Sequence, residues 1–344
     1  MIEIDGSYGE GGGQIVRTSV ALSAVTGKSV LIKRIRQGRP KPGLAAQHAQ
    51  AIKTLGQICN ADIKGAEPGS SEVLFCPQEI RGISRRVEIG TAGSVTLLMQ
   101  CLLPALLHAE GRTSLHVQGG TDVQWSATVD YCQNVFLPAL SFFGGRAELQ
   151  LLRRGYYPRG QGEVLLEVEP SHLKPAHIRH EPLAASQNRV KGISHCSNLP
   201  QHVAGRQAGS AIERLQEAGY EAQIAQETSR LASTGSGISL WTAGKGASSL
   251  GEKGLPAEKV GRRAAEEIIR ELASLAAVDA HLADQLIPYL ALAGGSFTVR
   301  EISLHTKTNI WTAGHFMDAK FEITAKCGVF EIESRWLSAK SPGQ

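Results

Sequence analysis

A glycine-rich turn with a single acid is the first stretch of this chain that could carry chemistry: residues 9–14 read Gly-Glu-Gly-Gly-Gly-Gln. The turn precedes a predicted helix over 14–26, and free backbone N–H groups at a helix N-terminus favour a bound phosphate. Its spacing matches neither the P-loop nor the dinucleotide-binding fingerprint, and a tight turn without any ligand is the structural alternative. Glu10 favours the binding site, because a carboxylate beside bare backbone is a natural ligand for a phosphate-bound Mg²⁺.

A basic loop over 34–43 is the second candidate, and two prolines make it rigid. Arg36 and Arg39 in this loop are suited to bidentate recognition of phosphate. Arg17, one helical turn after the glycines, is placed to join the same patch. A loop of this composition is also often only a solvated surface, so the alternative stays open.

His305 is the third candidate, in a stretch over 301–310 whose alternation predicts a strand. One face of that strand would be apolar or β-branched, and the other, with His305 beside Lys307, would be entirely polar. A lone histidine is more often structural than catalytic, and a solvated surface histidine is the alternative here. A neutral imidazole is nevertheless a competent nucleophile near neutral pH.

The composition is that of a globular protein large enough for two domains, with 344 residues, 42% hydrophobic and 20% charged. A net charge of +4 favours anionic partners only mildly. Six scattered cysteines without a C-x-x-C pair argue against zinc and against a disulfide framework, and they predict a cytoplasmic location. The most apolar run, 95–107, is too short to span a bilayer, so no membrane partner is expected.

The elements that must position these residues recur along the chain. Two successive strand–helix–strand–helix–strand–strand patterns predict an internal repeat of roughly 80 residues. The second helices end similarly over 51–63 and 134–146, and 210–222 gives a third instance. Between about 184 and 278 the character changes to a Gly/Ser-rich stretch and a long charged helix. We therefore predict an α/β (α+β) fold with a large domain over 1–184 and 278–344 and a small inserted α/β domain over 185–277.

In combination, seven blocks of this sequence resemble the RNA 3′-terminal phosphate cyclase family, in its catalytic, histidine-containing branch. The blocks run in the family's order and cover 9–17, 36–48, 90–100, 119–122, 155–162, 283–286 and 305–310. The resemblance implies three repeated βαβαββ modules, similar to those of the enolpyruvyl transferases, with a smaller domain inserted.

The resemblance also implies an ATP-dependent, ligase-type nucleotidyl transferase. His305 would attack the α-phosphate of ATP, form a covalent bond to AMP and release pyrophosphate. The AMP would pass to an RNA 3′-phosphate, and the neighbouring 2′-hydroxyl would then expel it to leave a 2′,3′-cyclic phosphate.

Further roles follow from the same resemblance. Glu10 would hold Mg²⁺ or Mn²⁺, and the RNA end or its phosphates would contact Arg17, Arg36, Arg39 and Gln47. The nucleotide site would include Gln100, Tyr131, His281, Asp284 and Gln285. Tyr131 would stack on adenine, and His281 stands where the family can carry a tyrosine. Asp122 departs from the family pattern because no proline-rich run follows it, and Lys307 receives no role.

Two alternatives come from other functional classes. A cyclase-like RNA-binding protein could act in ribosome assembly without catalysis, but such relatives lack the nucleophilic histidine, so His305 argues against this reading. An enolpyruvyl transferase would need phosphoenolpyruvate and a different set of basic residues.

Overall fold

Three sheets that share one strand order form the framework of the protein, as a computed structural model of residues 1–180 and 189–336 describes it. Each sheet begins with a parallel pair of strands and continues with antiparallel neighbours. The orders are β1-β2-β4-β3, β5-β6-β8-β7 and β9-β14-β16-β15, which is the same pattern three times. The predicted α/β class with three βαβαββ modules is confirmed.

The first module spans β1 (Ile2–Asp5), α1 (Gly13–Thr26), β2 (Val30–Lys33), α2 (Ala46–Ile58), β3 (Asp62–Lys64) and β4 (Val73–Cys76). The second contains β5 (Ser84–Glu88), α3 (Val95–Leu106), β6 (Thr113–Gly119), α4 (Val129–Tyr131), the π-helical turn Cys132–Phe136, α5 (Leu137–Phe142), β7 (Arg146–Arg153) and β8 (Gly162–Glu169). The third contains β9 (Ala176–Ile178), α8 (Ala280–Ala293), β14 (Gly295–Val299), α9 (Leu304–Phe316), β15 (Ala319–Lys326) and β16 (Val329–Trp336).

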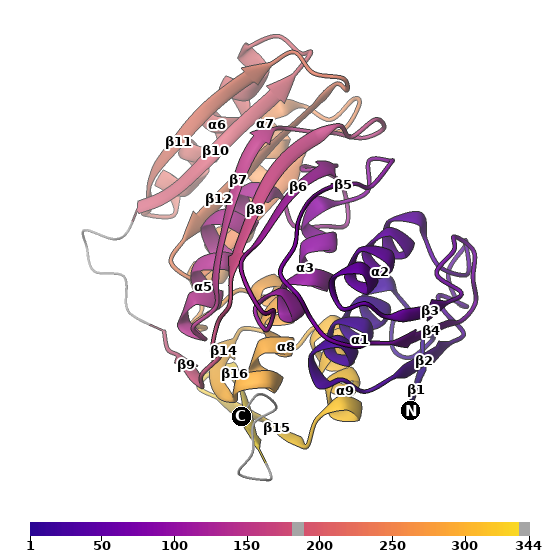
Figure 1. Cartoon of the computed structure of the whole chain (residues 1–344). Helices are drawn as coiled ribbons and strands as arrows, with labels where there is room; N and C mark the ends of the chain where they lie inside the picture. The colour runs from indigo at the N-terminus through magenta and orange to yellow at the C-terminus, as the bar shows by residue number, and fades with distance from the viewer. Residues whose placement is uncertain (181–188, 337–344) are drawn as a thin grey trace.

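The most buried helices are α1, α3 and α8, and they lie among the three sheets (Figure 1). Helix α1 packs against α2, α3 and α9, and α8 packs against α9, so the modules meet through their helices. Parallel strands need a helical crossover, which places both strand-to-helix turns of a module at one edge of its sheet. These turns carry all three sequence candidates for chemistry.

A fourth sheet is inserted between β9 and α8. It has the order β11-β10-β12-β13 and lies at the top of Figure 1 with α6 and α7. The bounds are β10 (Arg189–Ser197), α6 (His202–Glu217), β11 (Glu221–Ser229), β12 (Gly235–Thr242), β13 (Lys245–Leu250) and α7 (Ala257–Leu272). Val190, Leu215, Ile238 and Ile268 belong to a hydrophobic cluster of its own. The predicted domain boundary at 184/185 lies outside the described residues, and the division into two domains stays a prediction.

The helix-to-strand ending at 210–222 falls in α6 and β11, so this third instance of the repeat belongs to the inserted sheet and not to a module.

No helix of the described ranges 1–180 and 189–336 combines the length and apolar character needed to cross a membrane.

The predicted strand over 301–310 is wrong, because most of this stretch forms the start of helix α9. Ser303 caps the helix by accepting a hydrogen bond from the Thr306 backbone N–H at 2.9 Å. The helix buries Thr306, Asn309, Ala313 and Phe316, whose spacing is helical. Thr306 and Thr308 lie on the buried side of the helix, and their two-residue spacing imitated the alternation of a strand. Packing against the rest of the protein determined the helix instead.

Candidate active site

The glycine-rich loop of the first module lies directly against the first turns of α9 in the third module. Gly9 has a φ of +59°, and a Cβ at this position would lie 2.5 Å from Thr308 Oγ1. A left-handed backbone in so close a contact requires glycine. The Gln14 side chain donates a hydrogen bond to the His305 carbonyl at 3.4 Å. The loop therefore places Glu10 beside His305.

His305 sits in the first turn of α9 and is half exposed, with 46% of its side-chain surface accessible. Its Nδ1 lies 3.4 Å from Glu10 Oε2, and the same oxygen lies 3.3 Å from Arg39 Nη2. A carboxylate opposite Nδ1 favours the tautomer that carries its proton there. That tautomer leaves the lone pair on Nε2, as the predicted role of His305 as a nucleophile requires.

A second polar cluster surrounds His48, which is buried at the start of α2. Arg17 Nη1 and Gln47 Nε2 lie 3.3 and 3.4 Å from His48 Nε2. Burial, with the charges of Arg17 and Arg36, lowers the pKa of His48 to about 3. The imidazole is therefore neutral at physiological pH and accepts a hydrogen bond from Arg17.

Sequence reasoning assigned no role to His48, although this residue lies in the block 36–48 that resembles the family. A Cβ at Gly13 would lie only 2.0 Å from His48 Cε1, so this glycine makes room for the imidazole. Its neighbours in the cluster are the predicted phosphate-binding residues. Arg36 Nη1 donates to the Gly43 carbonyl at 3.0 Å, and Gln47 Oε1 accepts from the Ser94 backbone of the second module at 3.3 Å. Burial lowers the pKa of Arg17 to about 10, which leaves its guanidinium charged.

A cavity of about 170 Å³ opens on the other side of His305. It lies between α7 of the inserted sheet and the first turns of α8 and α9. Its lining includes Glu267, Arg270, His281, Asp284, Ser303 and His305. His305 therefore belongs both to the contact with Glu10 and to the wall of this cavity.

Asp284 of α8 forms hydrogen bonds with the first residues of α9. Its Oδ1 accepts hydrogen bonds from the hydroxyls of Ser303 and Thr306, and its backbone carbonyl accepts one from Asn309. Burial raises the pKa of Asp284 above its usual range despite these donors. Asp284 thus fixes the capping turn that carries His305, as well as lining the cavity.

Comparison with known proteins shows the family to which this chain belongs. A family model described as RNA 3′-terminal phosphate cyclase matches residues 8–323. The chain belongs to the RNA 3′-terminal phosphate cyclase family. Relatives with the name RNA 3′-terminal phosphate cyclase include one from Methanosarcina acetivorans, 54% identical over 96% of this chain and 99% of its own length. Another, from Pyrococcus furiosus, is 48% identical over 95% of this chain and 96% of its own.

A solved structure of EPSP synthase from Acinetobacter baumannii gives a TM-score of only 0.26 at 13% identity, over 65% of this chain and 56% of that one. This similarity is too low to carry an argument. The repeated strand order described above is the evidence for the modular fold of this member of the cyclase family.

Three residues predicted for the nucleotide site of this cyclase-family chain do not line the cavity: Gln100, Tyr131 and Gln285. Gln100 lies on α3, and the Gln285 side chain donates to the His281 carbonyl at 3.1 Å. The stacking role expected of Tyr131 does not fit its position, because its side chain is only 3% exposed. A buried ring offers no face to adenine.

Tyr131 instead belongs to a junction centred on Asp279, which the sequence reasoning missed. Asp279 accepts hydrogen bonds from the Tyr131 hydroxyl, the Leu282 backbone and the Gly246 backbone, each at 2.8 Å. These donors come from the second module, α8 and the inserted sheet. Burial raises the pKa of Asp279 to about 6. The junction fixes the floor of the cavity, because Gly246 and Asp279 both line it.

His281 lies at the cavity's mouth and is well exposed. Its Nε2 is 3.3 Å from Glu267 Oε1, and this contact raises the pKa of His281. Glu267 belongs to α7, so the pair joins the inserted sheet to α8. The His281 imidazole therefore lies beside the cavity, and its raised pKa favours the protonated, positively charged form.

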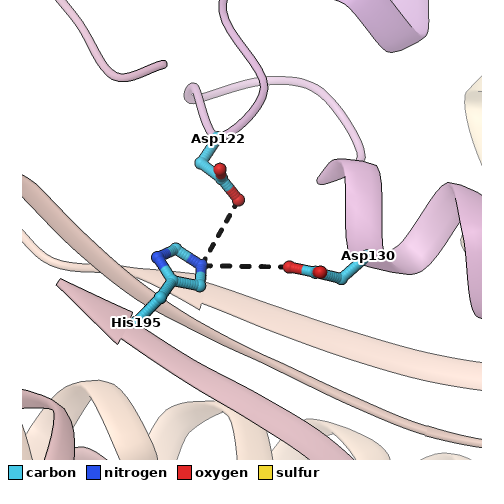
Figure 2. Close-up of side chains that lie close together, drawn as sticks. All are labelled: Asp122, Asp130 and His195. Carbon is cyan, nitrogen blue, oxygen red and sulfur yellow. Dashed lines mark ion pairs between the residues drawn. The ribbon is translucent and has the colours of Figure 1, made fainter. Parts of the chain in front are cut away.

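A buried ionic network fastens the inserted sheet to the second module (Figure 2). Asp122 and Asp130 point toward His195 of β10, with Nε2 lying 3.3 Å from Asp122 and 4.0 Å from Asp130. These three side chains could by type hold a metal ion. Arg154 Nη1, however, lies 3.3 Å from Asp122 and 2.8 Å from Asp130, so the guanidinium supplies the positive charge that a metal ion would otherwise bring. The network is a structural contact between the second module and the inserted sheet.

Proposed function

We propose that this protein converts an RNA 3′-terminal phosphate to a 2′,3′-cyclic phosphodiester at the expense of ATP. The observation that carries the proposal is the position of His305, between the Glu10 carboxylate at 3.4 Å and the cavity beneath α7. The names and identity levels of the relatives support the cyclase activity, and the site chemistry supports the steps below.

The first step is attack of His305 Nε2 on the α-phosphorus of ATP. The new P–N bond forms as the bond to the bridging oxygen breaks, and that oxygen leaves with pyrophosphate. The Glu10 carboxylate lies beside Nδ1 of the imidazole and favours the tautomer with its lone pair on Nε2. The positive end of α9 faces the phosphate that accumulates charge.

In the second step an oxygen of the RNA 3′-phosphate attacks the adenylate phosphorus and the P–N bond breaks, which restores His305. The 2′-hydroxyl then attacks the 3′-phosphorus, loses its proton and expels AMP. We assign the RNA phosphate to the cluster around His48, where Arg17, Arg36 and Gln47 converge, with Arg39 between this cluster and Glu10.

A divalent cation fits the Glu10 side of the site. One carboxylate together with substrate phosphates is the way proteins usually hold Mg²⁺, and Glu10 is 35% exposed on a loop of bare backbone. Such a cation would neutralise charge on the phosphates. Mg²⁺ and Mn²⁺ both suit an oxygen ligand set.

We assign the adenosine part of ATP to the cavity lined by His281, Asp284 and Arg270. The exposed His281 ring offers an aromatic face at its mouth, as a tyrosine would. We also propose a cytoplasmic location, because all six cysteines are free thiols.

The test is incubation with metal and ATP labelled at the α-phosphate, followed by denaturation. We expect a labelled adduct that survives alkali and not acid, and that His305→Ala does not form. A wild-type protein that binds RNA 3′-phosphate ends without forming the adduct would instead be a non-catalytic RNA-binding member of the family.

A further inference from the structure

An exposed aromatic stack stands beside the proposed RNA end site without a role in the chemistry above. The rings of Tyr8 and Trp311 lie 4.0 Å apart with planes inclined by 12°. His315 meets Trp311 edge-on at 4.5 Å. Tyr8 is 41% exposed and Trp311 is only partly buried. The stack is thus partly accessible to solvent, and Tyr8 lies two residues before Glu10 in the chain.

Trp311 is one of four side chains that form an outward stripe on α9: Leu304, Lys307, Trp311 and His315. Their spacing of three or four residues places them on one face of the helix. Leu304, Lys307 and His315 are exposed. The stripe starts at the residue before His305 and leads away from it. The stripe is therefore an exposed surface that begins next to the proposed nucleophile.

The structural alternative is that Tyr8 and Trp311 only hold the glycine-rich loop on α9. That loop is already held there by the close approach of Gly9 to Thr308, by Glu10 with His305, and by the hydrogen bond from Gln14. Exposed aromatic rings interleaved with cations are, in addition, the arrangement that binds single-stranded nucleic acid. Each base has a π-face that stacks on such rings, and a lysine meets the phosphate between bases.

We propose that Tyr8, Trp311 and Lys307 form a binding site for the single-stranded RNA that precedes the reacting 3′-phosphate. A base extends the Tyr8–Trp311 stack, and Lys307 contacts the backbone. Trp311 lies six residues beyond His305, which is about 9 Å along a helix. Stacked bases are separated by about 3.4 Å, so the platform meets the second or third nucleotide from the end. This inference rests on the proposed cyclase function and extends it to substrate selection.

The inference predicts a length-dependent preference that can be measured separately from catalysis. KM is determined for a nucleoside 3′-phosphate and for an RNA octamer with a 3′-phosphate, with wild type, Tyr8→Ala and Trp311→Ala. We expect each alanine variant to raise the octamer KM about tenfold, the effect of one lost stacking contact. The ratio of the KM for the nucleoside 3′-phosphate to the KM for the octamer should move toward one in the alanine variants. Trp311→Phe should restore most of the wild-type ratio.

Phe142→Ala is the matched control, because Phe142 is an exposed aromatic on α5 and should leave both KM values unchanged. Equal losses for both substrates, or no loss for the octamer, would overturn the inference in favour of a structural staple. Octamer affinity is also measured by fluorescence anisotropy on the same variants. If wild type forms no adduct, the proposed function fails, and the stacking site is then tested by octamer affinity alone. Octamer affinities that stay unchanged in Tyr8→Ala and Trp311→Ala would overturn the stacking site in that case as well.

Discussion

Glu10 Oε2 lies 3.4 Å from Nδ1 of His305, although the two residues belong to the first and last modules of the chain. The same oxygen contacts Arg39 at 3.3 Å. The carboxylate thus lies between His305 and Arg39, and 35% of its side-chain surface stays accessible. We propose that it both orients His305 and binds the cation, and substitutions at Glu10 can separate these two roles.

Glu10→Gln keeps an oxygen opposite His305 but removes the charge, and Glu10→Ala removes both. We expect Glu10→Gln to raise the metal concentration needed for half-maximal self-adenylation, with a nearly normal rate at saturation. Glu10→Ala should in addition lower the saturated rate about 100-fold, the usual loss for one preorganised polar group. Titrating Mn²⁺ against adduct yield measures both, and identical curves for the two variants would contradict the dual role.

The glycine-rich loop should tolerate no side chain at Gly9. Gly9→Ala forces an L-residue into a φ of +59° and drives its Cβ to 2.5 Å from Thr308 Oγ1. The displaced loop should lower adduct formation about 100-fold, as misplacement by about 1 Å can do. Adding Thr308→Ala removes the clashing oxygen and should recover part of the rate. No recovery would mean that backbone strain alone is responsible.

Arg39 should matter more for cyclisation than for self-adenylation. Arg39→Ala removes a cation next to the proposed RNA phosphate, and we expect cyclisation to fall about tenfold to 100-fold. Single-turnover transfer from preformed adduct isolates this step. Arg34→Ala is the matched control, since Arg34 lies in the same loop but pairs with Asp5. Equal losses in the two steps would contradict the assignment of Arg39.

The buried network around Arg154 should stabilise the contact between the inserted sheet and the second module. Arg154→Met leaves Asp122 and Asp130 without their cation, and breaking a buried pair costs about 3–5 kcal/mol. We expect a lower Tm together with a higher KM for ATP, because α7 forms one wall of the cavity. Adding Asp130→Asn should restore part of the Tm. A lower Tm at constant KM would separate the network from the nucleotide site.

Asp279 should give the protein a measurable pH dependence of stability. Its pKa rises from 3.8 to about 6 on burial, so between these values the native state binds more protons than the unfolded state. The free energy of unfolding therefore falls as pH rises through this window, by up to about 3 kcal/mol. In Asp279→Asn this slope should disappear, whatever the absolute Tm. A parallel slope in the variant would assign the dependence to other groups.

The sequence predicted the repeated module and the residues at its turns because both leave local signals. Glycines at 9–13 mark a turn, and Gly27, in the left-handed region, ends α1 where it was expected. His305 was taken as a candidate on the basis of a strand that the structure does not have, and its catalytic role stays a prediction. The capping signal Ser303 with Thr306 was present, but threonines on the buried face imitated a strand.

Other parts of the site left no signal in the local pattern. Asp279, Tyr131 and Gly246 meet only after three parts of the chain have packed, and the network of Arg154 with His195 crosses between two sheets. A tyrosine that donates to a buried carboxylate has the same local sequence as one that stacks on a base. Only the three-dimensional surroundings distinguish these roles.

His305 lies on α9, the last helix of the third module, so a growing chain contains the anion-binding residues before it contains His305. A chain that ends before α9 contains the glycine-rich loop and the basic cluster but lacks His305. Under the proposed mechanism, bond formation to AMP therefore requires the third module to dock on the first, where Gly9 meets Thr308. The proposed covalent step would then be reserved for molecules that include α9, and nascent or truncated chains without it would consume no ATP at this site.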